Sequence, residues 1–426
     1  MFEGKKKVKI TISDLHLGKG ADSIHEDFKH HPMGVDMDDT SQDYVLDQHP
    51  REFFEEITKN TSHCDEVILR FNGDTVDFST MRIPGEKIPR PYEENAVKKL
   101  KDVFDAHREF WSALANFLHT ADNTKVEFFY GNHDLQFYWP KIQEMLIQRL
   151  SPDCPEKVSF SFEKLEHGTY TRHGESEPHT KTNYKEPIIP ASKISKLLNE
   201  KDAHDTLDVS LGHYLSSLLM YEIKKNNYLT GRMLSHGFEY RNGFKHIFSR
   251  DWFRKRFFLF KTLWNVFIIF IYTIRPRFWH MKEKIGLIKI LRVIYWTFSG
   301  VFTGNTPKDS AMKLLHDRDD VDCVIYSHEH APTVLIKTIN GRTVTYMNTG
   351  TWVPLYREKN AKRPAPWKRF CWLQKIFFSI SSFFSKHELE EVWICSGVIE
   401  TIDYDGNIER QLVEWDRVEK TIKQLH

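Results

Sequence analysis

Short hydrophobic runs that end abruptly in polar residues recur along the N-terminal part of this chain. Three of them are Val8–Ser13, Val67–Phe71 and Val126–Tyr130. Their length and their β-branched and aromatic residues predict strands. Between the second and the third run, Glu93–Thr120 has apolar residues at helical spacing and no internal glycine or proline, which predicts a helix. Such alternation of strand and helix is typical of an α/β domain.

The C-terminal part follows a different pattern, in which turn residues separate β-prone runs. The expected strands and turns are Phe160–Arg172 with Gly168 near its turn, Val321–Tyr326 and Thr343–Met347 on either side of Asn340-Gly341, and Val392–Ile402 with Ile408–Trp415 around Asp405-Gly406-Asn407. Asn-Gly is a strong hairpin-turn dipeptide. Together the two parts predict an α/β (α+β) fold with helices outside and mixed sheets inside.

One long stretch, residues 178–310, does not show this alternation of predicted strands, helices and turns. It is polar from His179 to Asp208 and becomes aromatic and basic after Arg250. We interpret it as a large, mainly helical insertion that forms a lid or faces a membrane. The predicted organisation is therefore a discontinuous core, 1–177 and 311–426, with 178–310 inserted between two of its strands.

Composition and charge add only a few constraints on the fold, the partners and the cellular compartment. A chain of 426 residues with 40% hydrophobic residues is long enough to bury a large core. The formal net charge of +1 indicates no partner through bulk charge. Five scattered cysteines, an odd number without a Cys-x-x-Cys pair, favour a reducing compartment. The first 18 residues lack the apolar run of a signal peptide, so a cytoplasmic location is expected.

Polar blocks follow five of the β-prone runs. In chain order they are Asp14-Leu15-His16, Gly73-Asp74-Thr75-Val76-Asp77, Gly131-Asn132-His133-Asp134, Arg172-His173-Gly174-Glu175 and Ser327-His328-Glu329-His330. The carboxyl ends of strands in open α/β sheets converge on a crevice, so we expect these side chains to meet. Carboxylate, amide and imidazole ligands suit manganese, iron or zinc better than an all-oxygen calcium site.

This ordered set of blocks resembles the calcineurin-like metallophosphoesterase superfamily. The pattern of that superfamily is Asp-x-His, Gly-Asp-x-x-Asp, Gly-Asn-His-Asp/Glu, His-Gly and Gly-His-x-His. The first three blocks match, the fourth is present as His173-Gly174, and the fifth has Ser327 where glycine is usual. The resemblance covers roughly residues 8–177 and 321–352. It implies a four-layer α/β/β/α sandwich and a two-metal-dependent phosphoester hydrolase.

The resemblance also implies a role for each residue of the blocks. The first metal ion would be held by Asp14, His16 and His330, the second by Asn132, His173 and His328, and both by a bridging Asp74. His133 would stabilise or protonate the leaving oxygen, with Asp134 orienting it, while a water that bridges the ions attacks phosphorus. The implied cofactors are two divalent ions, with manganese expected and iron or zinc as alternatives.

Other histidines and one carboxylate compete with these assignments. Asp77 is expected to be structural or to support a ligand, because one carboxylate from its block suffices. His167 also precedes a glycine, but His173 is preferred because of the Arg-His-Gly-Glu context. His213 and His236 lie inside the insertion and are interpreted as ordinary surface or core residues.

Two features near the last block have open interpretations. The segment Asn348–Trp352 either returns the chain to the site or forms a tight turn after a strand. Glu329 has no assigned role and is expected to face solvent.

Two segments, 250–292 and 367–384, combine aromatic with basic residues. The first has eleven lysines and arginines against two acids, which suits a helix lying on anionic lipid. Its longest uncharged run, Thr262–Ile274, has thirteen residues, whereas a spanning helix needs about 20. A transmembrane helix at 257–274 and an aromatic lid packed on the core are the alternatives. No nucleic-acid partner is expected, since the rest of the chain is neutral.

The stretch Ser-Asp-Leu-His-Leu-Gly at 13–18 is similar to the opening of bacterial UDP-2,3-diacylglucosamine pyrophosphohydrolases, which are shorter and have a smaller lid. The expected substrate is therefore a lipid-linked or amphiphilic phosphoester or pyrophosphate, met by a protein peripheral on the inner face of a membrane. The alternatives are a soluble phosphomonoester or phosphodiester (a nucleotide or phosphoprotein) and a metal-free scaffold. All seven inferred ligand positions are filled, which disfavours the scaffold.

Overall fold

A computed structural model gives the fold of a large part of the chain. It describes residues 2–18, 41–81, 83, 91–175, 188–192, 204–209, 213, 306–353, 355–358 and 389–425. Residues 250–292 and 367–384 lie outside these ranges, as does most of the insertion 178–310, so the helices, lid and membrane contact expected there stay predictions. Among the residues described, no helix combines the length and the apolar character needed to cross a bilayer.

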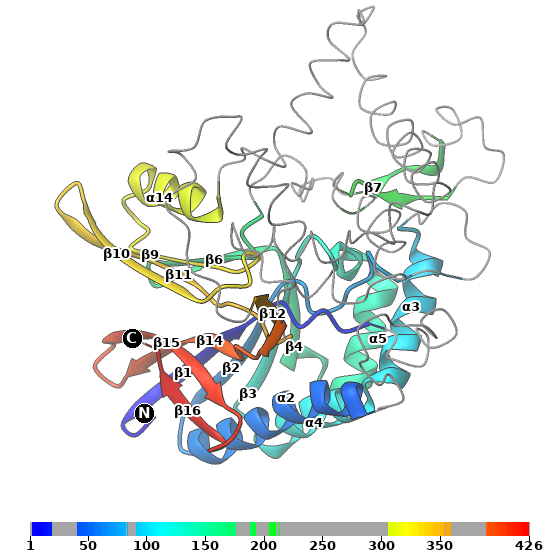
Figure 1. Cartoon of the computed structure of the whole chain (residues 1–426), viewed down its shortest axis with the longest axis horizontal. Coiled ribbons are helices and arrows are strands. Elements are labelled where there is room, and N and C mark those ends of the chain that lie inside the picture. The colour runs from blue at the N-terminus through cyan, green and yellow to red at the C-terminus, as the bar shows by residue number, and fades with distance from the viewer. Residues whose placement is uncertain are drawn as a thin grey trace, which may run out of the picture.

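A seven-stranded mixed sheet forms one half of the described fold (Figure 1). Four neighbouring strands run parallel: β1 (Lys5–Ile12), β2 (Glu66–Asn72), β3 (Thr124–Phe129) and β4 (Val158–Ser161). Three antiparallel strands extend the sheet beyond β1: β14 (Ser396–Asp403), β15 (Ile408–Asp416) and β16 (Thr421–Gln424). The parallel strands direct the ends of β1, β2 and β3 to one edge of the sheet.

A five-stranded sheet faces the first. Its order is β10 (Thr333–Ile339), β11 (Arg342–Asn348), β9 (Cys323–Tyr326), β6 (Thr169–Arg172) and β5 (Glu163–Glu166). Helix α14 (Pro307–Asp317) packs on β9 and β11. Two short pairs complete the strands, namely β7 (Ile188–Ile189) with β8 (Thr206–Leu207), and β12 (Leu355–Glu358) with β13 (Leu389–Val392). The predicted combination of helices with mixed sheets is thus confirmed.

Helices pack against the seven-stranded sheet on the side away from the second sheet (Figure 1). They are α2 (Ser41–Thr61), α3 (Glu93–Ala106), α4 (Arg108–Thr120) and α5 (Pro140–Leu150), with short 3-10 turns at Leu135–Tyr138 and Pro155–Lys157. The prediction of one continuous helix over Glu93–Thr120 is wrong at His107. Its backbone leaves the helical region (φ −119°, ψ 47°), and its Nδ1 lies 2.7 Å from Oδ1 of Asp47. This buried polar contact separates α3 from α4.

The predicted turns form, but two hairpins have different partners. Asn340-Gly341, with φ of 52° and 78°, joins β11 to β10, whereas the predicted strand Val321–Tyr326 becomes β9 and lies parallel to β11. Phe160–Arg172 is divided between the sheets, because Val158–Ser161 pairs with β3 while β5 and β6 turn at Gly168. The last hairpin is confirmed, although β14 begins at Ser396.

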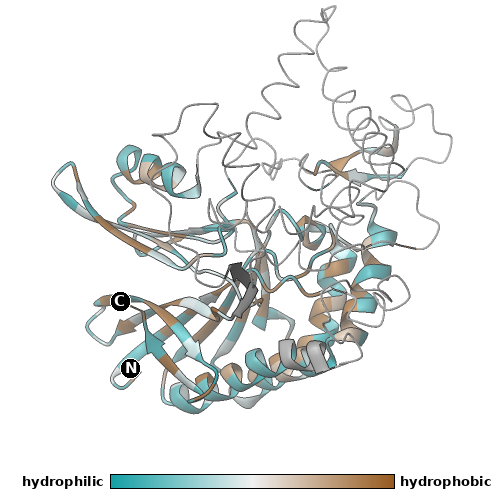
Figure 2. Ribbon diagram, viewed as in Figure 1, coloured by the Kyte–Doolittle hydropathy of each residue, from teal (hydrophilic) through white to brown (hydrophobic). Residues whose placement is uncertain are grey.

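Hydrophobic and hydrophilic residues are mixed along the strands of the large sheet (Figure 2). In β1, Val8, Ile10 and Ile12 join the core beneath the helices. The intervening Lys9 and Thr11 face the second sheet and are nevertheless buried. A strand has a side-chain period of two, so the same sequence supplies an apolar helix contact and a polar layer between the sheets.

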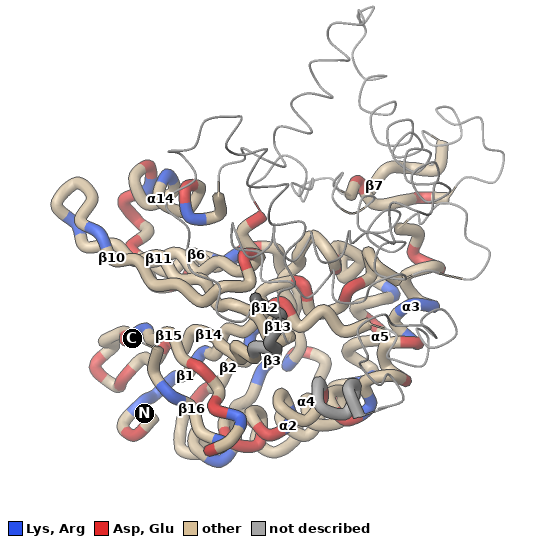
Figure 3. The backbone as a smooth tube through the Cα atoms, in the orientation of Figure 1, with Lys and Arg blue, Asp and Glu red and all other residues tan. Residues whose placement is uncertain are grey.

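Arg70 is the centre of this polar layer. Its guanidinium donates to Glu127 on β3 (2.7 Å), to Glu166 on β5 (3.0 Å) and to Thr171 on β6 (3.2 Å). Lys9 also donates to Glu166, at 2.7 Å. Arg70 is 1% exposed. Removal of one partner from this buried network would therefore leave another charge uncompensated. On the surface, by contrast, basic and acidic residues are interspersed over the described elements (Figure 3).

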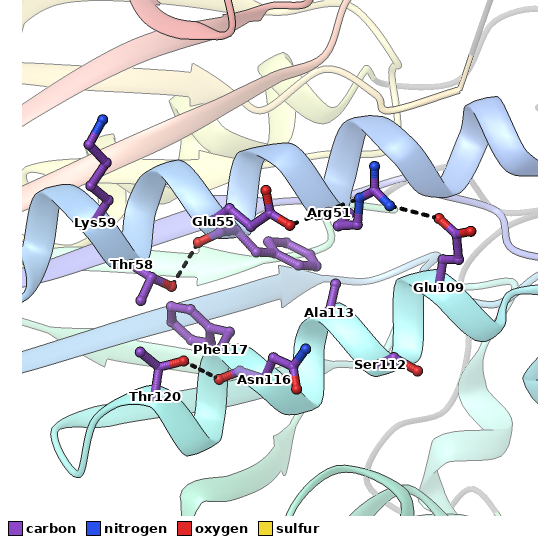
Figure 4. A pocket seen from close by; sticks show the side chains of 11 residues that line it. Arg51, Glu55, Thr58, Lys59, Glu109, Ser112, Ala113, Asn116, Phe117 and Thr120 are labelled. Atoms are coloured by element: carbon purple, nitrogen blue, oxygen red, sulfur yellow. Dashed lines mark hydrogen bonds and ion pairs between the residues drawn. The ribbon is translucent and has the colours of Figure 1, made fainter.

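A groove of about 460 Å³ lies between α2 and α4, on the helix side of the large sheet (Figure 4). Arg51 of α2 bridges its rim to Glu109 of α4, with 3.1 Å between Nη1 and Oε2. The lining contains none of the predicted ligands. This groove therefore belongs to the packing of the two helices, and the chemistry has to be sought at the strand ends.

We expect Arg70→Met to lower the free energy of unfolding by about 3 kcal/mol, because Glu127 and Glu166 lose a buried counter-charge. The matched control is Arg108→Met. Arg108 pairs with Asp105 on the surface, where both side chains are more than 70% exposed, and its loss should change stability by less than about 0.5 kcal/mol. Urea unfolding followed by circular dichroism measures both values. Equal stability of the two variants would contradict the account of the polar layer.

Candidate metal centre

The five polar blocks of the sequence all follow strands of the two sheets. They come after β1, β2 and β3 in the large sheet and after β6 and β9 in the small one. Within each set the strands run parallel, so each set of blocks leaves its sheet at one edge. Ser327 N donates to His173 O and so joins the two blocks of the small sheet. His328 N donates to Asp14 Oδ2 and so connects the small-sheet set to the large-sheet set. The predicted site residues are thereby brought together.

One group of side chains is formed by the first and the last block. Nε2 of His330 lies 3.1 Å from Oδ1 of Asp14 and 3.2 Å from Nε2 of His16. The His16 nitrogen also lies 3.8 Å from the same Asp14 oxygen. Three donor atoms thus converge within the reach of one ion. These are the three residues that the resemblance assigns to the first metal.

A second group surrounds His173. Its Nε2 lies 3.3 Å from Oδ2 of Asp74 and 3.1 Å from Oδ1 of Asn132, and its ring centroid is 5.2 Å from that of His328. Its Nδ1 is 2.8 Å from the carbonyl of Asn72, which holds the proton there and directs Nε2 toward the group. The carboxylate Oδ2 of Asp74 is also 3.8 Å from His16, so Asp74 lies between the two groups.

Backbone strain is concentrated in these residues. Eight described residues other than glycine have positive φ, and five of them are Asp14 (53°), His16 (48°), Asp74 (54°), His328 (72°) and His330 (59°). A positive φ is unfavourable for residues other than glycine and persists only where the surrounding structure imposes it. The strained backbone thus belongs to residues whose donor groups converge on one small volume.

Glycine is needed next to Asp74 for a different reason. A Cβ atom at Gly131 would overlap the carboxylate and the backbone nitrogen of Asp74. Gly73 has φ of 85°, and a Cβ there would overlap the His173 ring. The blocks after β2, β3 and β6 therefore approach each other more closely than residues with side chains allow.

Charge in this buried cluster is only partly balanced by histidine. Burial opposes ionisation of Asp74, but the rings of His173 and His133 outweigh it and hold the pKa of the carboxyl well below its usual value. Burial likewise opposes the imidazolium of His173, yet Asp74 and Asp14 hold its pKa well above the usual value. Burial and the neighbouring His133 lower the pKa of His16 to about 4. Anionic carboxylates beside a neutral imidazole provide a strongly cation-attracting environment.

The donor set fits a divalent metal ion. Carboxylate oxygen, amide oxygen and imidazole nitrogen together suit manganese, iron or zinc. Each of the two groups contains three His or Asp residues whose donor atoms lie within 4.8 Å of one another. A third overlapping group, His16 with Asp74 and His133, meets the same criterion. The residues present could therefore hold a metal ion.

A hydroxyl chain behind the site was not anticipated from the sequence. Thr349 Oγ1 lies 2.6 Å from Ser13 Oγ and 2.9 Å from Ser327 Oγ, and Asn72 donates to Ser327 Oγ at 2.7 Å. Thr351 donates to the carbonyl of Asp14. The segment 348–352 thus returns to the site. Ser327 does not have positive φ, so its position does not require glycine, and its hydroxyl connects the two sheets.

The prediction that Asp134 orients His133 is wrong. Asp134 accepts from the backbone of Gly131 (2.6 Å) and Thr75 (2.7 Å), so its carboxylate shapes the loops. The carboxylate beside His133 is that of Asp77, with 2.7 Å between Oδ1 and Nδ1. The sequence pattern Gly-Asp-x-x-Asp could have pointed to Asp77, because its second aspartate is part of the same polar block as Asp74. Asp77 was expected to be structural or to support a ligand, and it lies beside His133 and 3.9 Å from Nδ1 of the predicted ligand His16.

The histidines that were alternatives to His173 as ligands lie in different parts of the chain. His167 lies in the turn between β5 and β6, at the opposite end of β6 from His173. His213 is buried, while His236 lies outside the described residues. Glu329 is half-buried and accepts from the hydroxyl of Tyr346 at 3.2 Å, so it does not simply face solvent.

No model of a known protein family matches this chain, and no curated protein matches it either.

We expect Mn²⁺ binding at pH 7 to release about one proton, because the raised pKa of His173 keeps that ring charged until the ion displaces its proton. The affinity should accordingly rise with pH through the neutral range. Titration calorimetry in Tris and in PIPES gives the proton number from the dependence of the heat on buffer ionisation. His167→Ala is the control and should behave like the native chain. A heat that is independent of the buffer would contradict the assignment of His173.

Proposed function

We propose that this chain is a two-metal-dependent phosphoester hydrolase of the calcineurin-like type. The observation that carries the proposal is the division of the ligands into two groups with Asp74 between them. The facing sheets, with helices on the outer side of each, support the four-layer α/β/β/α sandwich that we propose as the core. The order of the five blocks along the chain supports the same conclusion.

The first ion would be held by Asp14, His16 and His330, the second by Asn132, His173 and His328, and Asp74 would contact both. Two divalent cations there would polarise a phosphoryl group and acidify a water molecule. Manganese fits this mixed donor set, and iron or zinc are the alternatives. The contribution of the chain itself is to fix these side chains before substrate arrives, since preorganised charge requires no rearrangement during reaction.

We assign the protonation of the leaving group to His133. Its Nδ1 lies 2.7 Å from Asp77 and 2.6 Å from Ser79 Oγ, and its backbone nitrogen donates to Asp74. Its ring is 4.8 Å from that of His16, so it borders the ligand groups. With Nδ1 engaged, Nε2 would donate a proton to the departing oxygen. Asp77 orients the ring and stabilises its charged form.

A phosphorylated compound is the proposed substrate, and a lipid-linked or amphiphilic phosphoester or pyrophosphate is our first choice. That choice rests on the aromatic, basic segments 250–292 and 367–384, through which we propose peripheral membrane contact on the cytoplasmic side. A soluble phosphoester is the second choice. A metal-free scaffold is disfavoured because it would leave Asp14 and Asp74 buried without enough positive charge.

We expect purified chain with Mn²⁺ to hydrolyse 4-nitrophenyl phosphate or its bis-ester, and chelation to stop the reaction. Asp74→Asn should abolish turnover because both ions lose a ligand. His133→Ala should lower kcat by about 100-fold or more, the usual contribution of a general acid. Absorbance at 405 nm follows the product.

Asp105→Asn, on the exposed surface of α3, is the control for the loss of a carboxylate and should keep full activity. Full activity in both site variants, or no metal-dependent turnover in the native chain, would contradict the proposed function. Comparing substrates with and without an acyl chain then distinguishes the amphiphilic from the soluble class.

A further inference from the structure

The loop that carries the last two predicted ligands is attached to the strand β11 beside it. This loop, residues 327–330, follows β9. His330 belongs to the first ligand group and His328 to the second, so one loop contributes to both groups. Both residues have positive φ, which persists only where neighbouring structure imposes it. Glu329, the residue between them, is held from the side of β11.

Glu329 accepts a hydrogen bond from a buried tyrosine of β11. The hydroxyl of Tyr346 lies 3.2 Å from Glu329 Oε2. Tyr346 is 0% exposed and belongs to the apolar cluster that includes residues of α14, so the position of its ring is fixed by packing. Glu329 itself is half-buried. A hydroxyl bonds more strongly to a carboxylate than to a neutral acceptor, and partial burial reduces competition from water.

The same tyrosine hydroxyl is part of a closed set of contacts around the loop. Asn348 Nδ2 donates to Tyr346 Oη at 3.3 Å and to the carbonyl of Ser327 at 2.7 Å. That carbonyl also accepts from the backbone nitrogen of Glu329, at 2.8 Å. Asn348 is itself held through its Oδ1, which accepts from Gly350 N at 3.0 Å. The end of β11 therefore fixes both the side chain and the backbone of Glu329.

We propose that Glu329 is a positioning residue for both metal sites and that it acts through its hydrogen bond to Tyr346. By holding the loop between His328 and His330, this bond sets the position of one imidazole in each ligand group. The inference rests on the proposed function, because it requires that each group holds an ion. It gives Glu329 a role in metal binding without direct contact with either ion.

A shared anchor has a consequence that the loss of a ligand does not have. Removing His328 or His330 takes one ligand from one group, so the affinity for one ion should fall more than the affinity for the other. Releasing the loop displaces both imidazoles, so both affinities should fall together. Residues that orient metal ligands typically change the affinity for the metal by about 10- to 100-fold. We expect the lower end here, because the other ligands of each group keep their own contacts.

The test measures Mn²⁺ binding to the full chain at neutral pH, using the electron paramagnetic resonance signal of free Mn²⁺. We expect Glu329→Ala and Tyr346→Phe each to weaken both sites by about tenfold. The double variant should be no weaker than either single variant, because both changes break the same hydrogen bond. Glu329→Gln keeps an oxygen that accepts from the tyrosine and should remain within about twofold of the native chain.

Tyr170→Phe is the matched control. It removes a tyrosine hydroxyl from the same apolar cluster, but this hydroxyl donates to Glu163 on β5 and not to the loop. Its affinity for Mn²⁺ should equal that of the native chain. Native affinity in Tyr346→Phe, weakening of only one site, or an equal loss in Glu329→Gln and Glu329→Ala would overturn the role of Glu329.

Thermal unfolding shows whether each variant is folded. If Tyr346→Phe does not fold, the comparison of Glu329→Ala with Glu329→Gln decides, because Glu329 is only half-buried and contributes little to the apolar core. A native chain that binds no Mn²⁺ rejects the proposed function itself, which separates the two failures.

Discussion

Burial of two carboxylates in one small volume is the constraint on which this site depends. Asp14 and Asp74 are 0% and 1% exposed, and both lie close to His16 and interact with His173. Each buried anion is unfavourable by several kcal/mol unless positive charge compensates it. The local histidines meet this need only in part, since His16 is neutral at pH 7. Divalent cations would complete the balance, and the strained backbone of five site residues holds the donors in place for them.

The surrounding fold supplies rigidity in two ways. β1 presents apolar residues to the helices and Lys9 and Thr11 to the second sheet. Arg70 and its partners then hold the sheets in register at the polar layer. At the strand ends, the hydroxyl chain of Ser13, Thr349 and Ser327 connects the blocks of the two sheets.

Periodicity predicted the parallel strands and their polar ends, because a buried strand has a strong local signature. It did not predict β10, whose residues are mostly exposed and lack regular alternation. The sequence pattern therefore placed Val321–Tyr326 as the strand before the Asn340-Gly341 turn, whereas it lies parallel to β11. The break at His107 depends on a tertiary contact with Asp47, which no local pattern contains. The carboxylate that contacts His133 could not be identified from the sequence either, because Asp77 and Asp134 both follow a predicted ligand. Only the tertiary fold brings Asp77, and not Asp134, beside His133.

We propose that the buried carboxylate of Asp74 lies between two metal positions. The most direct measurement is manganese content by atomic emission after gel filtration, combined with electron paramagnetic resonance of the retained ions. Two Mn²⁺ per chain that share Asp74 at about 4 Å should give the spectrum of a magnetically coupled pair. No retained manganese, or a spectrum of isolated ions only, would contradict the account.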